Sequence, residues 1–366
     1  MSRTLWFAAG PMLVGLLAIA IVGVRGLPAS APDPAALSSP HIVFAEFGLT
    51  ADQIYIAPAD APDERTLVDT VEHAEGWGIN PGAMRGHLVA YTVLPPGAAP
   101  ERDVPAELWL LDVSTNERTR LARDADLLIK PQFIDAGTLI YRHSDGNRQA
   151  IVRVEVETSA RSVVYEEQTA FGILPIGYDA SGALLFSRLS TGGTDIYRMP
   201  PDEDPRLLLH ASDEIARDWQ LSPDGRALAY LAPEVSAERV VYRAHVVDLG
   251  GGTLSWPQVA TEGEHYGPTW TPEGALAVGQ EAATGAAPVA LLQPGKSPGT
   301  LAPPERGFDV PVAWSSGGEY LAARTFDGAN STMPGRESAV VIGSDGQRFP
   351  LAAAGEIILM GWLPSA

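Results

Sequence analysis

The chain has 366 residues, of which 45 are acidic and 25 are basic, giving a formal net charge of −20 at pH 7. This charge argues against nucleic acid and anionic lipid head groups as partners. The absence of cysteine excludes disulfides, thiolate catalysis and a lipoprotein-type cysteine anchor.

The N-terminus begins with a long apolar segment. Residues 5–24 carry no charge, and a helix of this length can cross the roughly 30 Å hydrocarbon core of a membrane. We therefore expect residues 1–27 to anchor the chain in the cytoplasmic membrane. A cleaved signal peptide is the alternative, because Ala29 to Ala31 resemble a signal-peptidase site, but Pro32 and the length of the apolar run favour an uncleaved anchor.

A linker rich in Pro, Ala and Ser follows the apolar segment at residues 28–40. Linkers of this composition hold a domain away from a surface. We expect a single-pass membrane protein whose domain, residues 41–366, lies outside the cytoplasm, in the periplasm or the extracellular space.

The domain opens with three strand-like segments and then repeats one pattern. The clearest copy is DWQLSPDGRALAYL from Asp218, where Pro, Asp and Gly form a turn between two apolar runs, as in a β-hairpin. The pattern recurs about every 43 to 54 residues, a spacing typical of propeller blades. Its key apolar positions are Ile79, Phe133, Tyr178, Leu221, Trp270 and Trp314.

Two more short strands follow each copy, so that one unit has four strands, like a propeller blade. The segments from His41 to Thr70 match the last three strands of a blade, whereas the C-terminal segment from Ile357 matches a first strand alone. The two fragments complete one blade. The sequence therefore predicts an all-β, seven-bladed β-propeller closed by pairing of Ile358 to Leu363 with the N-terminal blade at His41 to Phe47, preceded by one transmembrane helix.

The repeat resembles that of the TolB-type β-propellers, whose blades carry a W-S-P-D-G-like signature. The matching segments are Leu221 to Gly225, Trp270 to Gly274 and Trp314 to Gly318, with DIYRM from Asp195 as a third-strand match. The resemblance implies an interaction module that binds another envelope or membrane protein. Propellers of this kind also serve as sensor domains and as gating domains of prolyl-oligopeptidase-like hydrolases, so the resemblance specifies fold more than function.

Carboxylates occur on every expected link between the last strand of one blade and the first strand of the next. In a propeller these links emerge on one face, here called the loop face, and loops on a rigid scaffold often bind partners. The alternative, that each acid only caps a turn or bonds between blades, stays open. We expect this face to bind the partner through three aromatic anchors and three steering acids, namely Trp77, Trp219, Tyr266, Glu75, Asp218 and Glu264.

Catalytic signatures are missing from the sequence. It contains no H-E-x-x-H motif, P-loop or EF-hand loop, and its seven histidines lack the spacing of metal ligands. We expect no catalytic residue, no bound metal and no cofactor. A propeller that binds a small ligand, glycan or cation, or hydrolyses one, at the acidic mouth of its central channel is the alternative function.

Overall fold

The computed structural model describes residues 39–99, 104–235, 239–251, 253–254, 263–351 and 356–364. Within these residues the chain forms β-strands and no helix. The expected membrane anchor at residues 5–24 and most of the linker lie outside the described residues. In the part of the chain that is described, no helix is long and apolar enough to cross a membrane.

The strands pair mostly between sequence neighbours, and the first two sheets cover the N-terminal half. The first sheet has the order β29 (Ile357–Leu363), β1 (His41–Glu46), β2 (Ala51–Pro58) and β3 (Thr66–Glu72). The second sheet contains β4 (Asn80–Pro81), β5 (Leu88–Val93), β6 (Ala106–Asp112), β7 (Glu117–Ala125), β8 (Gln132–Asp135), β9 (Thr138–Asp145), β10 (Arg148–Glu155) and β11 (Arg161–Gln168). Only one residue pair, Ala125 with His143, joins β7 to β9 in this eight-stranded sheet.

Two four-stranded sheets follow. They contain β12 (Ile173–Tyr178), β13 (Leu184–Ser190), β14 (Gly193–Met199) and β15 (Arg206–Ser212), and then β16 (Arg217–Leu221), β17 (Ala227–Val235), β18 (Val240–Asp248) and β19 (Thr253–Leu254).

The last two sheets contain β20 (His265–Trp270), β21 (Leu276–Gln280), β23 (Ala290–Leu292) and β24 (Gly299–Thr300), and then β25 (Gly307–Trp314), β26 (Tyr320–Phe326), β27 (Glu337–Gly343) and β28 (Arg348–Leu351). The short β22 (Ala286–Ala287) pairs in parallel with β25, so that a loop of one sheet is tied to the next sheet. No sequence pattern indicated this parallel pair.

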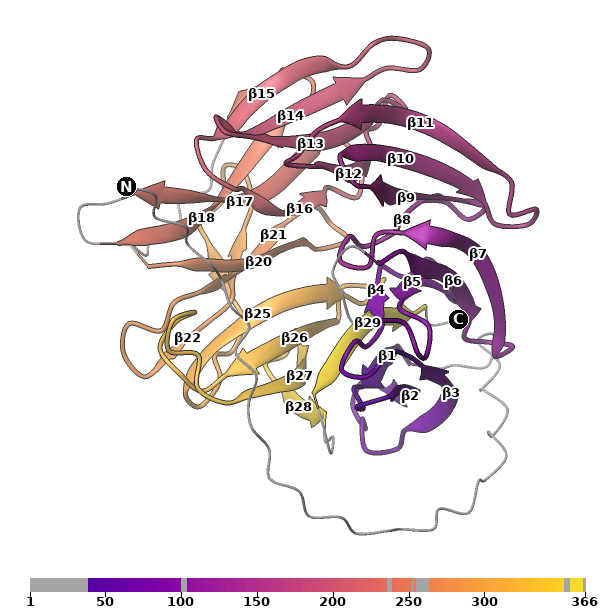
Figure 1. The fold of residues 1–366 in the computed structure, drawn as a ribbon. Coiled ribbons are helices and arrows are strands. Elements are labelled where there is room, and N and C mark those ends of the chain that lie inside the picture. The colour runs from indigo at the N-terminus through magenta and orange to yellow at the C-terminus, as the bar shows by residue number, and fades with distance from the viewer. Residues whose placement is uncertain are drawn as a thin grey trace, which may run out of the picture.

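The sheets follow one another around the molecule in chain order. Figure 1 shows this circuit from indigo at the lower right, through magenta and pink at the top, to orange on the left and yellow at the bottom. The yellow β29 lies beside the indigo β1, with which it pairs antiparallel from His41 opposite Leu363 to Glu46 opposite Ile357. The expected pairing of the two ends of the domain is therefore present.

The turn of the repeat has one geometry in several sheets. Gly225 donates its backbone N–H to the carbonyl of Ser222 at 2.8 Å, and the Ser222 hydroxyl accepts from the backbone of Ala227 at 2.9 Å. Thr271 and Ser315 take the place of Ser222 in two later copies. The glycine of each copy has a positive φ, which explains why this position is glycine.

Side chains pack between adjacent sheets. One cluster joins Val43 and Val71 of the first sheet to Tyr91 of the second, and another joins Phe44 to Val341 of the last sheet. Tryptophans of the repeat add hydrogen bonds between sheets. Trp270 Nε1 donates to the carbonyl of Gln220 at 2.9 Å, and Trp362 Nε1 donates to that of Ala313 at 3.0 Å. The circuit is thus held by apolar packing and by these indole contacts.

Candidate functional site

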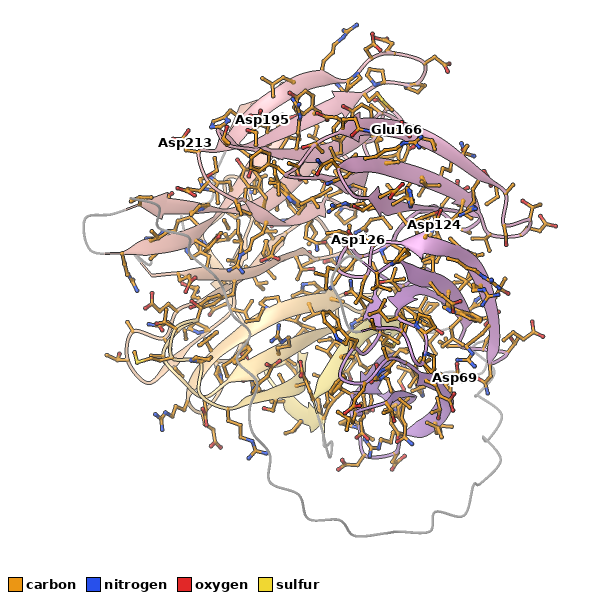
Figure 2. The ribbon with its side chains drawn as sticks, in the orientation of Figure 1. Asp69, Asp124, Asp126, Glu166, Asp195 and Asp213 are labelled. Carbon is orange, nitrogen blue, oxygen red and sulfur yellow. The ribbon has the colours of Figure 1, made fainter. Side chains whose placement is uncertain are left out.

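The acids of the loop face are distributed around the circuit, and many have a counter-ion close by. Asp124, Glu166 and Asp213 lie at the ends of three successive outer strands and are well separated in Figure 2. Their partners are Arg161 at 2.7 Å, Arg148 at 2.6 Å and His210 at 3.1 Å. Pairing of exposed charges reduces the field that these carboxylates project into solvent.

Glu75 and Trp77 lie on the link between β3 and β4. Glu75 is exposed. Trp77 is partly buried and packs against a small apolar cluster that includes Leu94 and Leu127. The indole is therefore anchored in the fold while Glu75 faces solvent beside it.

Asp218 and Trp219 lie in β16. Asp218 has a positive φ of 57°, and its side chain is 47% exposed, with Arg217 Nε 3.8 Å away. Trp219 is partly buried and stacks on Tyr230, with ring centroids 4.9 Å apart. Asp218 therefore presents its carboxylate to solvent, whereas part of the Trp219 ring belongs to the core.

Tyr266 and Glu264 lie inside the molecule, with 5% and 8% exposure. Tyr266 stacks on Phe308 and donates its hydroxyl to Glu264 Oε2 at 3.0 Å. Ser331 donates to the same carboxylate oxygen, so this pair holds the loop between β26 and β27. Burial raises the pKa of Tyr266, and the neighbouring Glu264 raises it further.

His265, between these two residues, is 3% exposed and accepts a hydrogen bond at Nδ1 from the backbone N–H of Ala244 at 3.1 Å. Burial, followed by repulsion from Arg243 and His245, lowers its pKa to about 4 from an ordinary value of 6.5. As the pH falls, His265 is therefore protonated at a higher pH in the unfolded chain than in the folded chain.

His265 thus contributes stability that is complete above pH 6.5 and is lost as pH falls from 6.5 to 4, about 3 kcal/mol in all. We expect His265→Gln to make the free energy of unfolding less dependent on pH across this window, as measured by urea unfolding at successive pH values. His210→Gln is the control, because Asp195 and Asp213 raise the pKa of exposed His210. An unchanged pH slope in His265→Gln would contradict the assignment.

Lys130 and Arg324, which come from other parts of the chain, lie near enough to Asp218 for the three charges to interact. Burial lowers the pKa of Lys130, while Asp218 raises it and Arg324 lowers it. Arg324 in turn pairs with Glu337. Three different parts of the circuit therefore contribute to one charged cluster, which contains the acid Asp218 and the cations Lys130 and Arg324.

A metal site does not emerge from the geometry. Among the described residues, no group of three or more His, Asp or Glu side chains is placed to hold a metal ion.

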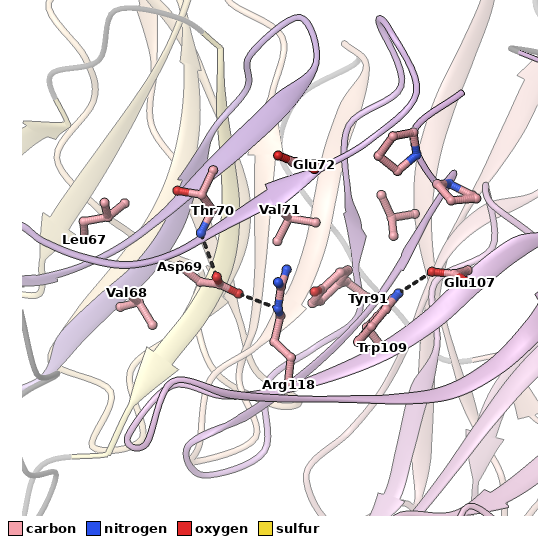
Figure 3. A pocket seen from close by; sticks show the side chains of 13 residues that line it. Leu67, Val68, Asp69, Thr70, Val71, Glu72, Tyr91, Glu107, Trp109 and Arg118 are labelled. Carbon is pink, nitrogen blue, oxygen red and sulfur yellow. Dashed lines mark hydrogen bonds and ion pairs between the residues drawn. The ribbon is translucent and has the colours of Figure 1, made fainter. Parts of the chain in front are cut away.

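The sequence analysis missed a pocket of about 660 Å³ between the first two sheets, shown in Figure 3. Its walls come from β3, β5, β6 and β7 and from the loop after β5. Its lining residues are Leu67, Val68, Asp69, Thr70, Val71, Glu72, Tyr91, Val93, Pro95, Pro96, Glu107, Trp109 and Arg118.

The polar groups of the pocket face one another across the two sheets. Arg118 Nε lies 3.2 Å from Asp69 Oδ2, and Tyr91 lies beside them in Figure 3. Trp109 Nε1 donates to Glu107 Oε2 at 2.9 Å. The one sequence signal was Asp69, a carboxylate within a strand, between Val68 and Thr70. The rest could not be found because the lining comes from several separate strands.

Comparison with known proteins identifies the fold. No protein-family model matches the chain, and no curated protein matches it in sequence. The chain is similar in structure to TolB from Acinetobacter baumannii, with a TM-score of 0.51, 14% identity, and coverage of 93% of this chain and 69% of that one. These values support the β-propeller fold and leave the function open.

Two further propellers match at similar levels. For the β-propeller domain of the Trilobed protease from Pyrococcus furiosus the TM-score is 0.57, with 14% identity and coverage of 87% of this chain and 98% of that one. That domain has an open velcro topology, whereas here β29 pairs with β1. An oligogalacturonate lyase in complex with manganese has a TM-score of 0.54, 14% identity, and coverage of 87% and 86%.

Proposed function

We propose that this protein is a membrane-tethered, extracytoplasmic β-propeller that acts as a scaffold or accessory subunit of a cell-envelope complex. The observation that carries the proposal is the placement of exposed Glu75 and Asp218 beside the partly buried Trp77 and Trp219. A rigid aromatic ring beside a solvent-facing charge suits binding of another protein, because the charge guides approach and the ring supplies affinity.

The proposal includes seven blades. The eight-stranded sheet divides at the single pair Ala125–His143 into β4 to β7 and β8 to β11. This division, together with the other five sheets, supports a count of seven four-stranded units.

The proposal also places residues 5–24 in the cytoplasmic membrane and residues 41–366 outside the cytoplasm, as the apolar run and the linker indicate. The full-length protein should then stay in the membrane fraction through a high-salt wash, and external protease should reach the propeller. Release of a soluble species beginning near Pro32 would contradict the tether.

The partner surface can be tested by crosslinking, because the chain has no cysteine of its own. A photoreactive maleimide on Glu75→Cys should yield an adduct with one membrane protein in a fixed ratio. The matched control is Asp224→Cys, in a turn at the other end of the strands that begin at the loop face. Equal adducts from both positions would contradict a partner surface on the loop face.

Steering by the loop-face acids gives a second prediction. In the double variant Glu75→Gln and Asp218→Asn, association with the captured partner should be several-fold slower and less dependent on salt. Stability should change by less than about 0.5 kcal/mol, because both side chains are exposed and Asn adopts the positive φ of Asp218 readily. Trp219→Ala should lower the melting temperature as well, because the ring stacks on Tyr230. Unchanged association in the double variant would place the partner elsewhere.

The second candidate function is binding of a small ligand, glycan or cation at the centre of the ring. The mixed charges of Lys130, Arg324 and Asp218 favour this candidate. A ligand that raises the melting temperature of the isolated protein, with no crosslinked partner, would support it over the scaffold.

A further inference from the structure

Exposed apolar side chains gather on the loop face. Neighbouring strands of each sheet are antiparallel, so the loop between the second and third strands of a unit emerges on the same face as the links. Within the described residues, most of the exposed large apolar side chains lie on these links and loops or at the strand ends beside them, namely Leu49, Leu128, Phe171, Ile215, Val235, Val240 and Met333. Val163 and Leu207 are also exposed, but they lie near the first residues of the outer strands β11 and β15, at the opposite end. Apolar surface concentrated on one face marks a contact with another molecule.

Three of these side chains form a row over consecutive units of the ring. Leu128 lies on the link into β8, Phe171 on the link into β12 and Ile215 on the link into β16. Their exposed fractions are 47%, 52% and 59%. β8 lies against β12 and β12 lies against β16, so the three links are neighbours around the ring. These three residues are called the apolar row.

Buried side chains hold each link of the apolar row in place. In every link, one backbone carbonyl accepts a hydrogen bond from a buried polar side chain of the preceding unit. The pairs are Thr92 with the carbonyl of Leu127 at 2.9 Å, Gln149 with that of Thr169 at 3.3 Å, and Thr194 with that of Glu214 at 2.7 Å. The exposed apolar residue follows this carbonyl directly or after one residue. The row is therefore fixed before a partner binds, which lowers the entropy cost of binding.

The apolar surface continues from Ile215 onto the hairpin of β17 and β18. Tyr242 donates its hydroxyl to the carbonyl of Ile215 at 3.3 Å, and Arg217 lies over the Tyr242 ring at 4.1 Å. Val235 and Val240, at the adjoining ends of the two strands, pair with each other and are 72% and 57% exposed. Apolar side chains thus extend from the link into β8 to the end of this hairpin.

Acidic charge lies beside the apolar row. Asp213 and Asp195 share the imidazole of His210 (Figure 2), so at least one of these carboxylates keeps its charge. The Asp213 side chain is 99% exposed, and Glu214, next to Ile215, is exposed with no ion pair in the described part of the chain. Two other acids near the row have arginine partners, namely Asp126 with Arg142 at 3.6 Å and Glu166 with Arg148 at 2.6 Å. In a chain of net charge −20, this favours a basic partner and disfavours an anionic lipid surface.

The spacing of the apolar row matches one face of an α-helix. Adjacent sheets pack about 10 Å apart, and each unit contributes one side chain to the row. An α-helix rises about 1.5 Å per residue, so residues i and i+7 lie on the same face about 10.5 Å apart. The row therefore matches residues i, i+7 and i+14 of a helix of about 15 residues. Amphipathic helices commonly bind other proteins by laying such a face on an apolar surface.

We propose that the apolar row binds an amphipathic helix of the protein partner, whose apolar face covers the row and whose Lys or Arg side chains lie beside Asp213 and Glu214. The inference rests on the proposed function in taking a protein as the partner of the loop face. It adds the secondary structure and the charge of the segment that binds.

The first test measures binding of fluorescein-labelled peptides of about 15 residues to the full-length protein by fluorescence anisotropy. The Lys peptide has Leu at the a and d positions of successive heptads and Lys or Ala elsewhere. In the Glu peptide, Glu replaces every Lys. In the scrambled peptide, the residues of the Lys peptide are rearranged so that no face of the helix is apolar.

The Lys peptide should bind saturably, with one peptide per chain. The scrambled peptide should bind at least tenfold more weakly, because its Leu residues cannot all face the row, and the Glu peptide should not bind. Equal affinities of the Lys and scrambled peptides would overturn the proposal, and so would a Lys peptide that does not bind.

Two double variants locate the binding site. Phe171→Ser with Ile215→Ser removes two side chains of the apolar row and should weaken binding of the Lys peptide at least tenfold. Val163→Ser with Leu207→Ser is the matched control, because these side chains are 57% and 56% exposed but lie on the outer strands, and it should bind like the wild type. Both variants should keep the wild-type melting temperature, since all four side chains are exposed. Equal weakening in the two variants would overturn the assignment to the row.

The acids beside the row are tested separately. Asp213→Asn with Glu214→Gln should weaken binding of the Lys peptide several-fold and make it less dependent on salt, because both side chains are exposed carboxylates. Unchanged affinity and salt dependence would contradict the charge assigned to the helix.

A lipid surface is the other possible occupant of the row. Since the chain has no cysteine, a polarity-sensitive fluorophore can be attached to Ile215→Cys alone. Its emission should shift to the blue when the Lys peptide is added and stay unchanged when phosphatidylcholine vesicles are added. A blue shift with vesicles alone would assign the row to lipid and overturn the helix site.

The outcomes separate this site from the proposed function. A partner that is crosslinked from Glu75→Cys and still binds the variant Phe171→Ser with Ile215→Ser would support the scaffold and overturn the helix site. Peptide binding that depends on the row, without a crosslinked partner, would support the helix site and reject the contact at Glu75.

Discussion

Deletion of residues 357–366 is expected to unfold or aggregate the domain. It removes β29, which pairs with β1 along the whole of that strand. It also removes Met360, Trp362 and Leu363, all less than 8% exposed. Burial of each such side chain contributes about 1.5 to 3 kcal/mol, so the loss is comparable to the total stability of a typical domain, about 5 to 15 kcal/mol.

The deletion also exposes β1 as a new apolar edge. Residues Ile42 to Ala45 are fully buried and would face solvent on the side that β29 now covers. Edges of this kind pair with other chains and lead to aggregation. Size-exclusion chromatography and circular dichroism should therefore show soluble aggregates or an unfolded chain.

The control is a shorter deletion of residues 364–366, which leaves β29 intact. It should melt like the full-length protein. A second control, Trp362→Phe, keeps an aromatic ring but loses the indole bond to Ala313, and should lower stability by about 1 kcal/mol. If the long deletion melts like the full-length protein, closure by β29 does not stabilise the domain.

The closure could be predicted from sequence because its determinants are local. The turn residues around Ser222 and Gly225 fix their own hydrogen bonds and φ values, so each copy of the repeat is visible in a short window. The incomplete units at the two ends then require each other. The parallel β22 could not be predicted, because it forms only two residue pairs, both with a strand of the next sheet.

The candidate site was harder to predict because a sequence does not show which side of a strand faces solvent near a loop. Glu264 and Asp218 both precede aromatic residues in the expected links, yet Glu264 is buried under Ser331 and Asp218 faces solvent. The pocket between the first two sheets contains an ion pair between Asp69 of one sheet and Arg118 of the other. Contacts of this kind depend on how two sheets pack together, and they leave no periodic pattern in the sequence.

Replacement of Arg348 by Met is expected to be the most destabilising single substitution considered. Its partner Asp309 lies in β25 and is 1% exposed. Arg348 donates from both terminal nitrogens to its carboxylate, at 2.7 and 2.9 Å, and also bonds to the carbonyl of Ala302 at 3.1 Å. The variant would leave a buried charge without its partner, which costs about 3 to 5 kcal/mol.

The comparison variants separate a lost charge partner from lost packing. In Asp309→Leu with Arg348→Met, both charges are gone, so most of the stability should return. Arg206→Met is the exposed control, because the Arg206–Glu203 pair is 76% and 47% exposed and should be worth less than about 1 kcal/mol. Urea unfolding gives the free energies. If Arg348→Met costs no more than Arg206→Met, the buried pair does not stabilise the last sheet, and Asp309 must find another partner when Arg348 is absent.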